Sequence, residues 1–194
     1  VMFLISGMAE TGRAPFDLAR IARFYAGDTA DSFARGRSFQ SAGGDHVHGT
    51  NGMASALAGI ADAQARGDAD ALASAEQRLR MLYGIVFAAA GLPALYMGDE
   101  IALANDEGYI EDPLRAIEGR WLHRPMMDWP VADAVAAGGH ADTTTDRIGS
   151  ARRAMIAARR STPALRADVP MRVLDFKHAA LLGIARGDDF VALF

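Results

Sequence analysis

The sequence predicts an α/β fold that ends in antiparallel strands, and two observations lead to this prediction. Residues 70–90 carry apolar side chains at three- and four-residue steps and are followed at once by the apolar segment 92–97. A helix that leads directly into a short apolar run is typical of a helix preceding a buried parallel strand. Further along, short apolar or alternating runs at 171–176, 179–185 and 190–194 are typical of antiparallel strands.

Composition limits the function classes. The 194 residues are enough for one ordinary domain or for a piece of a larger one, and 51% of them are apolar. A net charge of −4 gives no reason to expect nucleic acid or an anionic membrane as a partner. The absence of cysteine excludes disulfides, zinc thiolates and cysteine nucleophiles. No apolar run is long enough to span a bilayer, and no export signal is visible, which favours a cytoplasmic location.

The first third of the chain predicts little regular structure. Roughly helical spacing of apolar residues predicts a helix at 16–25, and the Gly-, Ser- and Asp-rich sequence up to residue 49 predicts a long loop. Thr50 is a good N-cap, which predicts a helix that begins there and is broken at 65–70.

The remaining elements follow from similar signals. Gly91 suits the position that stops the helix at 70–90. A long loop is predicted from Asp99 to about residue 142, followed by a helix at 146–160. The RGDD sequence at 186–189 predicts a hairpin turn.

Asp99 and Glu100 stand directly after the apolar segment 92–97, in the sequence YMGDE. In α/β folds the chemistry gathers at the carboxyl ends of parallel strands, which makes both residues candidates for a substrate site. Adjacent side chains point in different directions, however, and are a poor facing pair for a retaining glycosidase. A structural role is therefore favoured over direct catalysis.

The segment GRWLHRPMMDW at 119–129 interleaves polar and aromatic residues: Arg120, Trp121, His123, Arg124 and Trp129. Sugar sites combine aromatic faces with planar hydrogen-bond donors, so Arg120 and His123 are candidate binding residues. A surface loop pinned by two tryptophans explains the same pattern, and both interpretations stay open. The two histidines of GGDHVHGT, two residues apart, favour a solvated loop over a metal site, and we expect no metal and no cofactor.

Several segments together resemble the α-amylase-type glycoside hydrolases, glycoside hydrolase family 13, and within them the amylosucrases. They are FYAGD with DSFARGRSFQ, GGDHVHGT, LRMLYGIVFAAAGLPALYMGDEIALANDEGY, EDP and GRWLHRPMMDW, and they cover most of residues 1–165. The resemblance implies the C-terminal part of a (β/α)8 TIM barrel. Residues 1–49 would be a loop-rich insertion after strand seven, 50–165 the last helices with strand eight at 92–97, and 166–194 the truncated start of an antiparallel β domain.

The resemblance also implies a chemistry. Amylosucrases transfer glucose from sucrose to water or an α-1,4-glucan through a covalent glucosyl-enzyme, using an Asp nucleophile, a Glu acid/base and an Asp stabiliser. None of the three acids has a matching position in this sequence, so no catalytic residue is assigned. Arg120 matches the family arginine that helps close the glucosyl pocket. We therefore expect sucrose and α-glucans as substrates of the whole protein, and no turnover by this chain alone.

Two alternatives from other classes remain open. One is a hydrolase, or a trehalose or sucrose isomerase, of the same superfamily, because the barrel-end motifs are shared among these activities. The other is a non-catalytic sugar-binding module. Both ends of the chain lie within apolar runs, which indicates a fragment, and the pattern predicts no oligomeric state.

Overall fold

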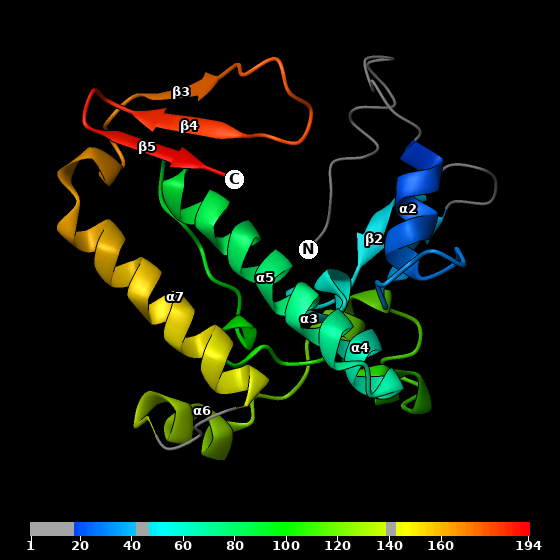
Figure 1. Ribbon diagram of the computed structural model, residues 1–194. Helices are drawn as coiled ribbons and strands as arrows, with labels where there is room; N and C mark the ends of the chain where they lie inside the picture. The colour runs from blue at the N-terminus through cyan, green and yellow to red at the C-terminus, as the bar shows by residue number, and fades with distance from the viewer. Residues whose placement is uncertain (1–17, 42–46, 139–142) are drawn as a thin grey trace. The chain divides into compact units, whose positions relative to one another are not determined.

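The computed structural model describes residues 18–41, 47–138 and 143–194 (Figure 1). The helices are α2 (Leu18–Ala26), α3 (Ala54–Ala58), α4 (Ile60–Arg66), α5 (Ala69–Ala88), α6 (Trp129–Ala136) and α7 (Thr144–Ser161). The 3-10 helices are η1 (Asp99–Ile101), η2 (Glu107–Glu111), η3 (Gly119–His123) and η4 (Pro163–Leu165). The strands are β1 (Arg37–Ser41), β2 (Val47–Asn51), β3 (Met171–Leu174), β4 (Gly183–Arg186) and β5 (Phe190–Leu193). The expected mixture of helices and strands is confirmed.

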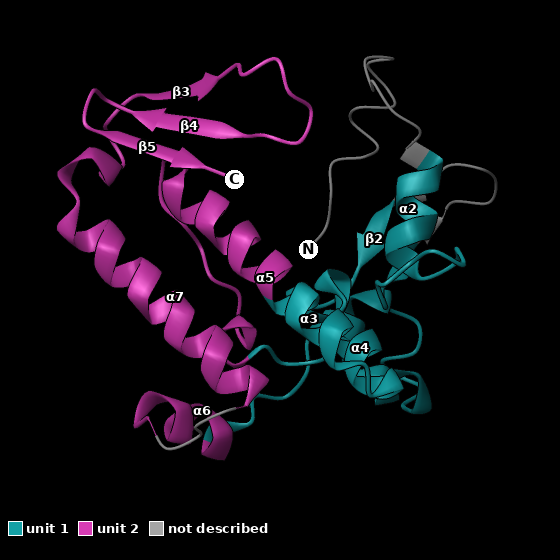
Figure 2. Ribbon diagram, in the orientation of Figure 1, with its two compact units in different colours: residues 1–76, 102–129 teal, residues 77–101, 130–194 magenta. Residues whose placement is uncertain are grey.

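The chain divides into two compact units, which Figure 2 colours separately. Unit 1 comprises residues 1–76 and 102–129, and unit 2 comprises residues 77–101 and 130–194. Each unit therefore contains segments that are far apart in the sequence. The boundaries expected at 49/50 and 165/166 refer to a larger architecture and stay a prediction.

Unit 1 contains an antiparallel hairpin that the sequence did not predict. β1 pairs with β2 in a register that sets Arg37 opposite Asn51 and Phe39 opposite Gly49. Part of the predicted loop up to residue 49 is thus a pair of strands. The alternation that marks a strand is weak here, because Phe39 is the one large apolar side chain of β1 and is buried. Packing of α2 against both strands supplies what the pattern lacks.

The helix predicted to begin at Thr50 begins later and is interrupted. Thr50 is fully buried in β2, and α3 starts only at Ala54. Gly59, with φ of 100°, ends α3 and precedes α4, because its left-handed backbone cannot continue a helix. The apolar side chains that the sequence places on one face of this helix, Met53, Leu57 and Ile60, are all buried in the core.

Unit 2 contains the long helix α7 and the larger part of the long helix α5, and the predicted bounds of both helices are confirmed within two residues. α5 ends at Ala88 and α7 spans Thr144–Ser161. The Thr143 side chain caps α7 by accepting a hydrogen bond from the Asp146 backbone N–H at 3.1 Å. Gly91 does have a left-handed backbone, with φ of 86°, but it lies three residues beyond the end of α5.

Two arginines, rather than Gly91, occupy the carbonyl oxygens at the end of α5. Arg186 donates to the carbonyls of Ala88 and Ala89 at 2.9 and 2.7 Å, and Arg159 donates to the carbonyl of Ala89 at 3.1 Å. Cationic donors at this end also suit the helix dipole. The prediction that Gly91 ends the helix is therefore wrong. The helix ends three residues earlier, and arginine side chains distant in sequence donate to its last carbonyls.

The segment 92–97 differs from the expected buried strand. It forms no regular strand and belongs to neither sheet of the described residues. Its apolar side chains are exposed, and Leu92 retains 88% of its accessible surface. The expected burial is thus not observed, because no described segment supplies a neighbouring backbone and an apolar cover.

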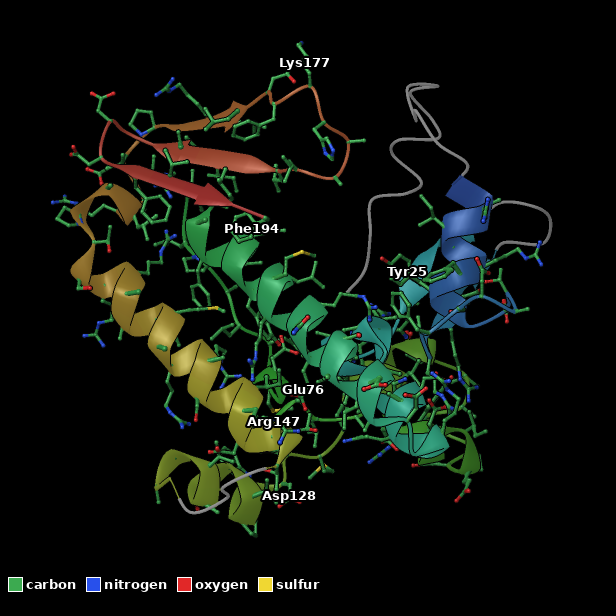
Figure 3. The ribbon with its side chains drawn as sticks, in the orientation of Figure 1. Tyr25, Glu76, Asp128, Arg147, Lys177 and Phe194 are labelled. Atoms are coloured by element: carbon green, nitrogen blue, oxygen red, sulfur yellow. The ribbon has the colours of Figure 1, made fainter. Side chains whose placement is uncertain are left out.

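The three C-terminal strands form the sheet β3–β4–β5, antiparallel throughout. The turn predicted at 186–189 is confirmed, with Gly187 in the left-handed region at φ of 55°. β4 is the central strand and is buried along its whole length. Phe194 follows β5, and its ring packs beside Gly84 of α5 (Figure 3). Over the described ranges, no helix is long and apolar enough to cross a membrane.

Candidate functional site

The candidate site in unit 1 is organised by η3, which contains Arg120 and His123. The β1–β2 hairpin packs against η3. Leu122 is fully buried beneath the turn, and its carbonyl accepts from the Asp106 backbone N–H at 2.9 Å. The buried Leu122 side chain therefore fixes η3, with its polar side chains, to the core of unit 1.

Asn51 connects the end of β2 to η3. Its side chain is 1% exposed, and its amide Nδ2 donates to the Gly119 carbonyl at the start of η3. Its Oδ1 lies in hydrogen-bond contact with His123 Nδ1 at the end of the same turn. One buried amide thus holds both ends of η3 against the hairpin. Sequence reasoning missed Asn51, because an asparagine at a strand end carries no distinctive signal.

His123 is half-buried, and this burial lowers the pKa of its imidazole to about 4. The positive charges of Arg124 and Arg120 act in the same direction, and the Glu118 carboxylate opposes them. Since the ordinary pKa of histidine is about 6.5, the ring is neutral across the physiological range. His123 is then suited to hydrogen bonding and not to carrying positive charge.

Arg120 is exposed and is held by a neighbour. Its guanidinium pairs with the Glu118 carboxylate at 2.5 Å, and the same carboxylate accepts the Arg120 backbone N–H at 3.1 Å. These two hydrogen bonds lower the pKa of Glu118 to about 2. The resemblance also implies that Arg120 pairs with an acid elsewhere in the barrel. That acid is not part of this chain, and the pairing stays a prediction.

The aromatic residues of the loop have different surroundings. The guanidinium groups of Arg115 and Arg124 lie 4.9 and 5.6 Å from the centre of the Trp121 ring. Trp121 is thus engaged in cation–π contacts within its own loop. Trp129, by contrast, is 63% exposed. The pinned-loop interpretation describes Trp121, whereas Trp129 retains an aromatic surface for a ligand.

Asn105 is a second organising residue that sequence reasoning did not single out. Its Oδ1 accepts from the Met53 backbone N–H at 2.8 Å, and its Nδ2 donates to the Arg35 carbonyl at 2.6 Å. Nearby, Arg37 pairs with Glu107 at 2.7 Å and lies over the ring of Tyr109. Asn105 therefore connects the loop after Ile101 to the segment just before β1 and to the residue just before α3.

Asp99 and Glu100 belong to unit 2, in η1. Burial raises the pKa of Asp99, while the Tyr96 backbone and the Arg152 guanidinium pull it down. Asp99 in turn contributes, after burial, to a raised pKa of the buried Tyr83 hydroxyl. Glu100 accepts from the Gly98 backbone N–H at 2.8 Å. Asp99 thus interacts with groups of α5 and α7, and Glu100 with the turn before η1, and their expected part in substrate binding stays a prediction.

The four predicted binding residues thus fall in two units: Arg120 and His123 in unit 1, Asp99 and Glu100 in unit 2. Within the part of the chain that the structure describes, no group of three or more His, Asp or Glu side chains could hold a metal ion. The first histidine of GGDHVHGT, His46, lies outside the described residues. No protein-family model matches the sequence.

Proposed function

We propose that this chain is the C-terminal portion of a retaining α-glucosyltransferase of the α-amylase type, acting on sucrose as amylosucrases do. In this proposal the chain supplies strand eight and its loops to a TIM barrel and begins the β domain. The catalytic acids come from polypeptide outside these residues. Arg120 and His123 contribute to the wall of the glucosyl pocket.

The observation that supports the proposal best is a convergence within unit 1. Three of the segments that carry the resemblance lie far apart in the sequence, yet one set of hydrogen bonds joins them. Asn51, which directly follows GGDHVHGT, contacts Gly119 and His123 of GRWLHRPMMDW. Asn105 of the ANDEGY segment contacts the backbone of Met53 and Arg35. Convergence of separate motifs is what a shared binding site requires.

A second observation supports the barrel part of the proposal. The apolar segment 92–97 is exposed, and its sequence is that of a strand buried on both faces. A pair of neighbouring parallel strands would satisfy its backbone groups and cover its side chains. Asp99 and Glu100 would then follow the carboxyl end of that strand, where they fix the loop that leads toward Asn105.

A hybrid enzyme tests the proposal. The C-terminal region of an amylosucrase-type enzyme is replaced by this chain, and fructose release and glucan formation from sucrose are measured. We expect an active hybrid, and we expect Arg120→Ala to lower kcat/KM roughly 100-fold, because a lost clamp misplaces the glucosyl ring. Arg160→Ala, at an exposed position near the end of α7, is the matched control and should leave kcat/KM unchanged.

The outcomes separate the alternatives. Transfer to a growing glucan supports the proposed activity, whereas isomerised sucrose assigns the chain to an isomerase of the same superfamily. A well-folded hybrid that binds glucans but does not cleave sucrose would instead favour a binding module. If Arg120→Ala and Arg160→Ala behave alike in an active hybrid, Arg120 does not line the pocket.

A further inference from the structure

We propose that Asn51 is a positioning residue that fixes the tautomer of His123, so that the ring keeps its proton on Nδ1 and presents Nε2 as an acceptor. This inference concerns the chain itself and does not depend on the proposed function. It rests on the contacts of one buried side chain, and it assigns the hydrogen-bonding role of a histidine that the sequence could only mark as a candidate.

The first step is the orientation of the Asn51 amide. The side chain is 1% exposed, so solvent cannot substitute for a missing partner. One end of the amide contacts the Gly119 carbonyl, which can only accept a hydrogen bond. The group that faces this carbonyl must therefore be the NH₂ of Asn51. The opposite orientation would bring two acceptor oxygens together in a buried place.

The second step transfers this orientation to His123. With Nδ2 committed to Gly119, the end of the amide that faces His123 Nδ1 is the oxygen Oδ1. An oxygen accepts, so Nδ1 must carry the proton. A neutral imidazole has one N–H, and Nε2 then holds a lone pair. The Gly119 carbonyl thus determines, through Asn51, which nitrogen of His123 is protonated.

The third step is the charge of the ring. Burial and the positive charges of Arg124 and Arg120 disfavour the imidazolium form, against the smaller opposing effect of Glu118. The partner from β2 is the uncharged Asn51. The pKa of His123 is lowered to about 4, so Nε2 stays unprotonated at neutral pH. Any group that meets Nε2 must donate to it, as a hydroxyl does, and His123 is then neither a general acid nor a cationic anchor.

Nitrogen-15 NMR of the full chain measures the tautomer directly, because a protonated and an unprotonated ring nitrogen resonate far apart. The chain has five histidines, so a His123→Gln variant identifies the signals that belong to His123. At pH 7 we expect a neutral ring with the proton on Nδ1, and a single protonation step near pH 4. A proton on Nε2, or an imidazolium at pH 7, would overturn the inference without any further variant.

Variants of Asn51 test whether this residue determines the tautomer of His123. Asn51→Ala removes the acceptor, and the tautomer protonated on Nε2, which is the preferred form of free histidine, should then appear. Asn51→Asp keeps an acceptor toward Nδ1 and adds a negative charge, although its second oxygen replaces the donor to the Gly119 carbonyl. In the folded variant the proton should stay on Nδ1 while the protonation step moves to higher pH. Persistence of the original tautomer in a folded Asn51→Ala chain would show that Asn51 does not determine it.

Glu118→Gln is the matched control, because it changes the charge near the ring and leaves the Asn51 contact in place. Removing this carboxylate should lower the pH of the His123 protonation step, since Glu118 favours the charged ring. The tautomer should not change. A variant of Glu118 that moved the proton to Nε2 would assign the control of the tautomer to electrostatics and would contradict the role of Asn51.

Discussion

Different kinds of hydrogen bond stabilise the interior of each of the two units. In unit 1, side-chain amides connect segments that are far apart in the sequence, as those of the buried Asn51 and the partly exposed Asn105 do, and short ion pairs line the surface. In unit 2, long helices and a sheet meet where arginines donate to backbone carbonyls at the end of α5. An amide both donates and accepts, and it suits a site where loops of mixed polarity converge. A guanidinium only donates, and it suits a row of unpaired carbonyls.

This difference between the units predicts which substitutions should destabilise the protein most. Arg186 is completely buried although it is charged, and its two terminal nitrogens donate to four carbonyls: those of Ala88 and Ala89 at the end of α5 and those of Arg166 and Val169. Its loss should affect β4, α5 and the segment before β3 together. Loss of an amide side chain of unit 1, such as Asn51 or Asn105, should mainly change local loop geometry, because each makes only two or three contacts.

The largest effect is expected for Arg186→Met in unit 2. Methionine fills a similar volume but donates nothing, so several buried carbonyls are left without partners and the free energy of unfolding should fall by about 3 kcal/mol or more. Hydrogen exchange should accelerate in residues 77–101 and 130–194 and stay unchanged in unit 1. The control is Arg166→Met, whose side chain is 72% exposed and pairs with Asp168, and its effect should be below about 0.5 kcal/mol. Equal effects of the two variants would contradict the special role of Arg186.

The next effect is expected for Leu122→Ala in unit 1. Leu122 is fully buried beneath η3, so truncation leaves a cavity and should cost about 2–4 kcal/mol in denaturant unfolding. Exchange should then accelerate in unit 1 while unit 2 keeps its protection. Leu114→Ala, at a position that is 82% exposed, is the matched control and should change little. Loss of protection in both units at once would mean that the two do not respond independently.

The smallest effect is expected for Thr143→Ala at the start of α7. The variant loses the hydrogen bond from the Asp146 backbone N–H, and the free energy of unfolding should fall by about 1 kcal/mol. Thr143→Ser retains the hydroxyl and should keep most of the stability. If the serine and alanine variants are equally destabilised, the hydroxyl is not the source of the capping energy.

Elements with strong local signals could be predicted from the sequence. α5 and α7 follow helical periodicity over about five turns, and Gly187 marks the turn between β4 and β5. The β1–β2 hairpin and the late start of α3 at Ala54 could not be predicted, because their strands are short and rich in small polar residues. In such segments packing against neighbours decides the conformation, and neighbours are not visible in a local window.

The candidate site also combines features that the sequence predicts with features that it does not predict. The sequence by itself determined that Arg120 and His123 share a polar loop, because they lie on one short segment. Only the tertiary structure decided that Asn51, 72 residues before His123, contacts that ring, and that Arg186 rather than Gly91 serves the end of α5. The physical reason is that a buried hydrogen-bond partner is chosen by which backbone groups the fold leaves unpaired, and that choice is made across the whole chain.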